Sequence, residues 1–336
     1  MAVLVALLPV IVFLLLLILF DSFKLVPTSM IVRALVAGAV AAVVASFAHR
    51  WILSRTVMDA GLFSRYVAPV TEETLKVLFL IYPLSRRQIG FLVDAAIIGF
   101  AVGAGFAVVE NIEYLRAVPD RRIWMWIVRG FGAAMLHAMT TAIIALSAKS
   151  LIDRQDRVWL AILPGWLLAI ALHSVFNHAL VSPVLAAAVL MLLLPLVVLA
   201  VFSHSEHRTR DWVGAGLDLD VELLQLVTSP EFGGTRLGRY LGELRSRFPG
   251  PVVADMFCLL QLDLELSIRA KGMLMARETG LDLPVDDALR ARLAERAYLE
   301  KTIGPTGLLA LRPLQVTTDR DRWHRYLLEA AGKKTV

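Results

Sequence analysis

The chain has 336 residues and a mass of 37.0 kDa, with 58% hydrophobic residues, 19% charged residues and a mean hydropathy of +0.69. Soluble domains contain about 45–50% apolar and about 25% charged residues, so this composition excludes an ordinary soluble enzyme and a disordered chain. The net charge of +5 would favour nucleic-acid binding only if it were gathered on one soluble domain.

Charged residues are distributed unevenly along the chain. Residues 1–203 carry 15 basic and 10 acidic residues, whereas residues 204–336 carry 19 of each. Charges are therefore sparse in the first part, and they are dense and balanced in the second, which argues against a nucleic-acid module. We predict a transmembrane domain over residues 1–203 and a soluble helical domain over residues 204–336.

Apolar stretches that can cross a bilayer, which takes about 20 residues, recur through the first part. Residues 3–20 form such a stretch, and Asp-Ser-Phe-Lys follows it in place of a small-residue cleavage site, so we predict a retained span rather than a signal peptide. Further stretches lie at about 29–48, 67–84, 91–115, 123–148, 158–181 and 183–203. We therefore predict an all-α bundle of about seven spans. Basic residues after the last span favour a cytoplasmic C-terminal part.

Two glycines lie four residues apart inside the fourth apolar stretch. Gly99 and Gly103 share one helical face, which allows a neighbouring helix to approach closely. A dinucleotide-binding loop would need a preceding strand, and none is expected here. The spacing therefore predicts helix packing.

Ionisable residues inside apolar helices are the most informative feature, because each costs about 2.5–3.5 kcal/mol to insert. They form four clusters on four predicted helices: Glu72, Glu73 and Lys76; Glu110, Asn111 and Tyr114; His137; and His173 with Asn177. Each cluster alone is explained by an ion pair between residues four apart, such as Glu72 and Lys76, by an interfacial belt, or by interhelical hydrogen bonds. Glu and His, however, bind Zn²⁺ and transfer protons to and from water, so four such clusters together predict one shared polar site.

Three other residues carry weaker expectations. Asp94 stands near a predicted helix start, and we expect it at the membrane interface. Arg129 is expected to snorkel or to form an ion pair. Cys258, the only cysteine, excludes an intramolecular disulfide and is expected to be a buried, inert thiol.

The four clusters, in this order, resemble the motifs of the PrsW family of intramembrane proteases, which is related to the CAAX-prenyl endopeptidases. The matching patterns are Glu72-Glu73-x-x-Lys76, Phe106-x3-Glu110-Asn111-x-x-Tyr114, His137 and His173-x3-Asn177, and the resemblance covers about residues 60–180. The CAAX enzymes usually carry Arg after the paired glutamates and His in the second motif, so Lys76 and Glu110 favour the PrsW branch. The resemblance implies a multi-pass endopeptidase of the bacterial plasma membrane that cleaves membrane-anchored proteins such as anti-sigma factors.

The resemblance implies chemistry of one of two forms. In the metal form, Glu110, His137 and His173 hold Zn²⁺, which lowers the pKa of a water whose proton passes to Glu72 or Glu73. Because Glu110 replaces a neutral histidine of the CAAX enzymes, it adds negative charge that favours a bound cation or a shared proton.

In the glutamyl form there is no metal. Glu72 or Glu73 deprotonates the water with help from Glu110 or His137, while His173 and Asn177 stabilise the developing oxyanion. In either form the supporting residues are Lys76, Asn111 and Tyr114.

A function of another class also uses intramembrane Glu and His residues: a non-catalytic transporter or an ion-binding sensor. Against transport, the stretches 67–84 and 158–181 do not resemble one another, so an inverted repeat is not evident. The lipid bilayer and a membrane-anchored protein are the expected partners.

The last 133 residues show apolar positions at helical spacing. Helices are predicted at about 218–228, 234–247, 251–279, 285–301 and 319–331, and prolines and glycines separate them. A stripe of Leu259, Leu262, Leu266 and Met273 predicts one buried face. Substrate recruitment, regulation by a partner and self-association all stay open for this domain, and it is expected to be dispensable for the chemistry.

Overall fold

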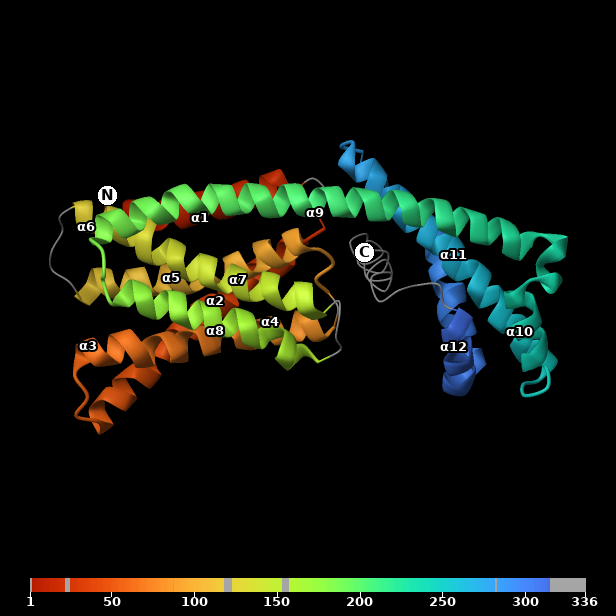
Figure 1. The fold of residues 1–336 in the computed structure, drawn as a ribbon, viewed down its shortest axis with the longest axis horizontal. Coiled ribbons are helices and arrows are strands. Elements are labelled where there is room, and N and C mark those ends of the chain that lie inside the picture. The colour runs from red at the N-terminus through yellow and green to blue at the C-terminus, as the bar shows by residue number, and fades with distance from the viewer. Residues whose placement is uncertain are drawn as a thin grey trace. The chain divides into compact units, whose positions relative to one another are not determined.

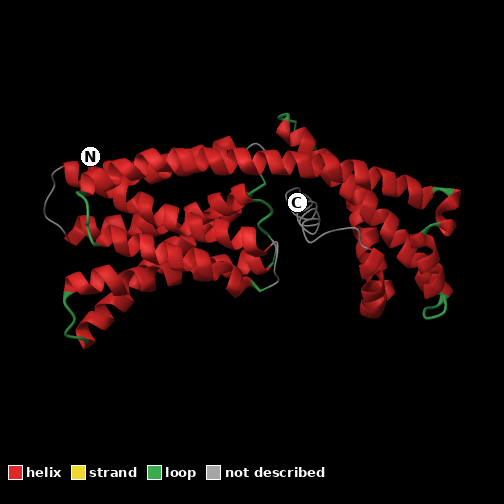
Figure 2. Cartoon of the chain, viewed as in Figure 1, coloured by secondary structure: helices red, strands yellow, loops and turns green. Residues whose placement is uncertain are grey.

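The structure is a computed structural model that describes residues 2–21, 25–86, 88–117, 123–152, 157–281 and 283–314. Within these ranges the secondary structure is helical and contains no strand (Figures 1 and 2). This confirms the predicted all-α fold class. The chain forms two compact units, Met1–Glu206 and His207–Val336, and each is described by itself.

Within the described residues, eight α-helices and two π-helical turns precede the long helix α9. The helices are α1 (Ala2–Phe20), α2 (Thr28–Arg55), α3 (Ala60–Leu62), α4 (Ala68–Ser85), α5 (Leu92–Ala117), α6 (Ile123–Val128), α7 (Met135–Ile152) and α8 (Val158–Asn177). The π-helical turns are η1 (Phe63–Val67), which leads into α4, and η2 (Arg129–Ala134), which leads into α7. Helix α9 (Pro183–Thr228) contributes residues to both units.

Four helical segments in the described ranges are long and apolar enough to cross a membrane: α2, α5, Met125–Ile152 and α8. Two further apolar segments, Val5–Phe20 and Pro183–Leu193, are shorter. Helix α4 carries three ionisable residues in 18, which lowers its tendency to insert. Four candidate spans support integration into a membrane, and the seven-span topology stays a prediction.

Helix α5 lies at the centre of the first unit, where it packs against α2 and α7. Every residue from Val93 to Ala107 is buried. A Cβ added at Gly103 would lie 2.2 Å from the backbone oxygen of His137, and one at Gly99 would lie 2.7 Å from that of Thr141. These distances confirm that both glycines serve close helix packing, and they place the α7 backbone at His137 directly against α5.

Asp94 is buried in the first turn of α5, near a helix start as predicted, and its place at the membrane interface stays a prediction. Its Oδ2 accepts hydrogen bonds from the backbone N–H groups of Gly90, at 3.0 Å, and Phe91, at 2.9 Å. A carboxylate that accepts from N–H groups at a helix start satisfies donors that have no partner within the helix. Asp94 is therefore explained by helix capping.

The second unit contains the end of α9, α10 (Arg236–Leu244), α11 (Gly250–Glu278) and α12 (Asp287–Leu311), with 3₁₀ turns at Pro230–Gly234 and Arg312–Leu314. The predicted stripe of α11 is buried, which confirms that expectation. Cys258 is exposed, so its predicted burial was wrong: it lies at the edge of that stripe, four residues before Leu262. The helix predicted at 319–331 lies outside the described residues.

Buried ion pairs join the helices of this unit. Lys271 Nζ lies 2.7 Å from Asp220 Oδ2, and Arg296 Nε lies 2.6 Å from Asp263 Oδ1. Both basic residues are almost fully buried. Such pairs fix the register of neighbouring helices because a single lost partner leaves an uncompensated charge.

The contact at Gly103 leads to a first prediction. Gly103→Ala forces α5 and α7 apart because the new methyl group overlaps the His137 carbonyl, and we expect a loss of about 1–3 kcal/mol in unfolding free energy. Gly242→Ala in α10 is the matched control, since a Cβ there meets nothing within 4 Å. Thermal unfolding in detergent measures both. A Gly103→Ala protein as stable as Gly242→Ala would contradict this packing.

Candidate functional site

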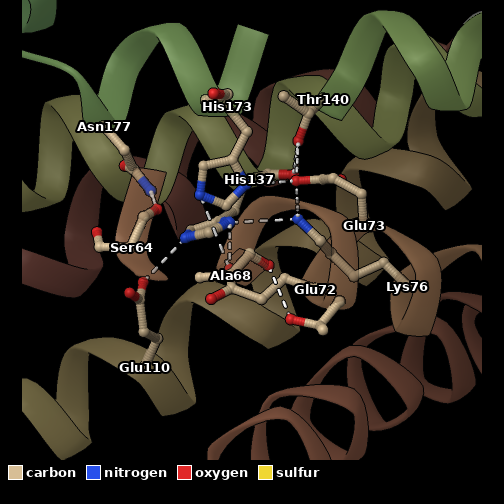
Figure 3. Close-up of polar contacts among 12 residues, drawn as sticks. Ser64, Ala68, Glu72, Glu73, Lys76, Glu110, His137, Thr140, His173 and Asn177 are labelled. Carbon is tan, nitrogen blue, oxygen red and sulfur yellow. Dashed lines mark hydrogen bonds and ion pairs between the residues drawn. The ribbon is translucent and has the colours of Figure 1, made fainter. Parts of the chain in front are cut away.

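Polar residues of four helices, most of them predicted from the sequence, converge in the first unit (Figure 3). The contributing residues are Glu72, Glu73 and Lys76 from α4, Glu110 from α5, His137 and Thr140 from α7, and His173 from α8. Pro69 stands in the first turn of α4, where its missing N–H costs nothing, and the glutamates follow within one turn. Because adjacent helical residues point about 100° apart, Glu72 and Glu73 face different neighbours.

Glu73 is fully buried and joins three helices. Its Oε1 accepts hydrogen bonds from Lys76 Nζ at 2.7 Å, His173 Nδ1 at 2.8 Å and Thr140 Oγ1 at 3.2 Å. The expected pairing of Glu72 with Lys76 was therefore wrong, because the lysine pairs with Glu73 three residues away. The buried carboxylate balances the buried ammonium, and Lys76 Nζ also lies 4.8 Å from the centre of the Phe106 ring.

Each of the two histidines places one ring nitrogen against a carboxylate. His173 Nδ1 contacts Glu73 Oε1, and His137 Nε2 lies 2.9 Å from Glu110 Oε2. An ionised carboxylate only accepts, so these nitrogens carry the hydrogens. In the neutral imidazoles, His137 Nδ1 and His173 Nε2 then bear lone pairs.

Both lone-pair nitrogens face Glu72. Its Oε2 lies 3.9 Å from His137 Nδ1 and 3.8 Å from His173 Nε2. This oxygen is buried and has no hydrogen-bond partner among the described residues. A carboxylate oxygen that faces two lone pairs is electrostatically unfavourable unless a cation or a proton lies between them.

The arrangement fits a small metal ion. Within the described residues, one group of three ligand atoms that can hold a metal comes from Glu72, His137 and His173, and these atoms lie within 4.8 Å of one another. The ligand atoms of a tetrahedral zinc ion lie about 3.3 Å apart. The two distances from Glu72 Oε2 to the histidine nitrogens, 3.9 and 3.8 Å, exceed this by well under 1 Å. Lys76 Nζ lies 3.2 Å from His137 Nδ1, a contact that a metal ion bound to this nitrogen would have to displace.

Glu110, predicted as a metal ligand, is not in this group. It lies behind His137, where its Oε2 contacts His137 Nε2 and also lies 3.0 Å from Arg129 Nη2. Arg129 in turn donates through Nε to Asn111 Oδ1 at 2.9 Å. The expected ion pair of Arg129 is thereby confirmed, and Glu110 contacts the ring nitrogen of His137 that does not face Glu72.

Asn177, predicted to stabilise an oxyanion, contacts the backbone at η1 (Figure 3). Its Nδ2 donates to the carbonyl of Ser64 at 2.8 Å, and Ser174 Oγ donates to the carbonyl of Arg65 at 2.7 Å. A π-helical turn departs from the regular α-helical hydrogen-bond pattern. Here the Asn177 and Ser174 side chains donate hydrogen bonds to two carbonyls of that turn. In this arrangement the end of α8 holds the segment that leads into the paired glutamates.

Two residues near the site were not predicted. Thr140 stands three residues after His137, hence on the same helical face, and this spacing was a usable signal. His49 ends the apolar stretch of α2, with Nδ1 4.0 Å from Glu72 Oε1 and Nε2 2.7 Å from Thr71 Oγ1. A histidine at the end of an apolar stretch is common, so sequence alone gave it no weight.

Comparison with known proteins agrees with this geometry. The sequence profile of the PrsW family of intramembrane metalloproteases matches residues 22–202, which is more than half of the chain. No curated protein and no solved structure matches the chain significantly. The chain belongs to the PrsW family, which supports an intramembrane peptidase, and its Glu72, His137 and His173 form a cluster that could hold a metal ion.

The paired glutamates are predicted to differ in their effect on stability. Glu73→Gln leaves the buried ammonium of Lys76 without its counterion, and we expect a loss of about 3–5 kcal/mol. Glu72→Gln removes an unpaired carboxylate oxygen, and we expect a change below about 1 kcal/mol in the metal-free protein. Thermal unfolding in detergent with a chelator present compares the two. Equal losses would contradict the assignment of Lys76 to Glu73.

Proposed function

We propose, starting from membership of the PrsW family, that this protein is an endopeptidase that hydrolyses peptide bonds of membrane-anchored proteins within or beside the bilayer. The observation that carries the proposal is the convergence of two imidazole nitrogens on Glu72 Oε2, at 3.8 and 3.9 Å. Both histidines and the glutamate are buried, which suits a site that must control water in an apolar surrounding.

We propose that Glu72, His137 and His173 are the protein ligands of a zinc ion. The choice of Glu72 over Glu110 rests on the geometry above, in which Glu110 takes the opposite nitrogen of His137. Zinc at such ligands polarises a peptide carbonyl and makes water a nucleophile near neutral pH. The side chains of this protein would orient the metal ligands and accept the proton of the water.

Glu73 and Glu110 are proposed to orient the two histidines. A carboxylate on the outer nitrogen of a ligating histidine fixes its tautomer and raises its basicity. Glu73 does this for His173 and Glu110 for His137. Glu73 Oε2 is buried and has no hydrogen-bond partner among the described residues, so it is our candidate for accepting a proton from the attacking water.

The metal-free form uses the same residues differently. There Glu72 itself takes the proton of the water, because its Oε2 is the carboxylate oxygen that faces both histidines. The oxyanion role of His173 and Asn177 belongs to this form. Because Asn177 Nδ2 carries two hydrogens and Ser64 takes one, the second remains for an oxyanion.

The proposal extends to the surroundings of the site. We propose a multi-pass protein of a bacterial plasma membrane, with the helical residues 204–336 on the cytoplasmic side as the surface for a regulatory partner. The four candidate spans support residence in a bilayer. The balanced charge of residues 204–336 supports a protein partner rather than nucleic acid.

Proteolysis of a membrane-anchored substrate by purified protein tests the proposed function. Glu72→Gln and His173→Ala are each expected to lower the cleavage rate at least about 100-fold, because each removes a group at the reacting centre. His204→Ala, at an exposed position of α9, is the matched control and should cleave at the wild-type rate. The proposal fails if all three variants cleave like the wild type.

Zinc content distinguishes the two ligand sets and the two forms. In the metal form the wild type holds one zinc per chain, which Glu72→Gln loses, whereas Glu110→Gln keeps the site with about 10–100-fold weaker affinity. Elemental analysis after dialysis against graded chelator measures this. Zinc lost only in Glu110→Gln would restore the ligand set predicted from sequence, and full activity of a zinc-free wild type would establish the glutamyl form.

A further inference from the structure

Arg129 is a charged residue of the first unit that the proposed chemistry does not yet use. It is the first residue of η2, the π-helical turn that leads into α7 and His137. π-Helical turns inside longer helices often occur at functional sites, because the extra residue changes the direction of the side chains. Here the guanidinium Nη2 lies 3.0 Å from Glu110 Oε2, on the far side of His137 from Glu72.

The guanidinium is held by the second motif. Its Nε donates to Asn111 Oδ1 at 2.9 Å, and its Cζ lies 4.0 Å from the centre of the Tyr114 ring. Asn111 is fully buried, and its Nδ2 donates to the carbonyl of Ala6 in α1 at 2.9 Å. Because that carbonyl only accepts, the amide of Asn111 must turn its oxygen toward Arg129. Asn111 and Tyr114 thus orient Arg129.

The orientation of His137 follows from donors and acceptors alone. Arg129 Nη2 forms an ion pair with Glu110 Oε2 at 3.0 Å without hydrogen-bond geometry, and an ionised carboxylate only accepts, so His137 Nε2 at 2.9 Å supplies a hydrogen to the same oxygen. On the other side of the ring, the Lys76 ammonium only donates, so His137 Nδ1 at 3.2 Å accepts. Both ends of the ring agree on one tautomer, in which the Nδ1 lone pair accepts from Lys76 and Glu72 Oε2 lies 3.9 Å from the same nitrogen.

We propose that Arg129 is a positioning residue: it anchors Glu110 against His137 Nε2 and thereby aims His137 Nδ1 at Glu72 and His173. Its effect on zinc affinity and on catalysis rests on the proposed function, whereas its effect on the His137 ring does not. Arg is suited to this task because its planar, multiply donating head contacts Glu110 and Asn111 at once while it stacks on Tyr114. Lysine cannot reproduce these contacts together.

The experiment compares full-length wild type, Arg129→Gln and Arg33→Gln by ¹⁵N-imidazole NMR in the metal-free state, with the His137 signal assigned by its loss in His137→Gln. Arg33 is the matched control, since it is exposed on a candidate span and its guanidinium contacts Ser29 of its own helix. We expect a downfield Nε2–H proton, protected from exchange with water, in the wild type and in Arg33→Gln. In Arg129→Gln it should move upfield and exchange. An unchanged signal in folded Arg129→Gln would overturn the proposal.

Zinc affinity and kinetics extend the test. Chelator competition should show about 10–100-fold weaker zinc binding in Arg129→Gln, the usual effect of removing an outer partner of a ligating histidine. The kcat should fall while KM stays within about twofold, because Arg129 acts through His137 rather than on substrate. If wild type and Arg129→Gln bind zinc and cleave alike, Arg129 has no positioning role.

The experiment also gives a decision if Arg129→Gln does not fold or if the wild type is inactive. If Arg129→Gln does not fold, Arg129→Lys replaces it: it keeps the charge beside Glu110, and an NMR signal and zinc affinity equal to wild type would overturn the proposal. If the wild type neither binds zinc nor cleaves, the proposed function fails, and the NMR comparison still decides on Arg129.

Discussion

The buried carboxylate of Glu73 is the interaction on which the geometry of the site depends. It accepts hydrogen bonds from Lys76, Thr140 and His173 and so ties together α4, α7 and α8. Taking a carboxylate and an ammonium out of water costs several kcal/mol each, and only close pairing with further hydrogen bonds offsets that cost. The residues that satisfy Glu73 are therefore held in place, and His173 is held with its Nε2 toward Glu72.

The second histidine is fixed by packing as much as by charge. Gly103 lets the α7 backbone at His137 lie against α5. This brings the imidazole beside Glu110, which lies on α5 like Gly103. A larger residue at Gly103 would displace the ring from its carboxylate. The two histidines thus reach one point by different routes, one through a buried ion pair and the other through a close helix contact. Glu72, left without a hydrogen-bond partner at Oε2, lies where they meet.

Much of this site follows from sequence, because apolar helices make ionisable residues conspicuous. The four clusters, their order and the shared polar site were all predictable, as was the close approach at Gly103. Which glutamate, Glu72 or Glu110, is placed to bind a metal together with the histidines was not predictable. Glu72 and Glu110 are equally plausible ligands on a helical projection, and the choice depends on which ring nitrogen of His137 each one meets.

Partners across helices were also beyond the reach of sequence. Spacing favours Glu72 with Lys76 at four residues and Glu73 with Lys76 at three almost equally, and burial of the second pair decides between them. Arg129 was expected to snorkel or to form an ion pair, but its partner was not predicted. Arg129 is the first residue of the π-helical turn η2, and no residue pattern predicts this turn. The number of spans depends on helices such as α4, whose 18 residues are nearly enough to cross a bilayer but whose three charged residues disfavour insertion.

Zinc-edge X-ray absorption of the zinc-loaded protein tests the central claim, that two imidazoles and Glu72 form one cation site, most directly. The account predicts a first shell of nitrogen and oxygen near 2.0–2.1 Å, with outer-shell scattering from two imidazole rings that falls to one ring in His173→Ala. In Glu72→Gln the specific spectrum should be lost, while Glu110→Gln should retain both rings. A spectrum with one imidazole or none in the wild type, or an unchanged two-imidazole spectrum in Glu72→Gln, would contradict it.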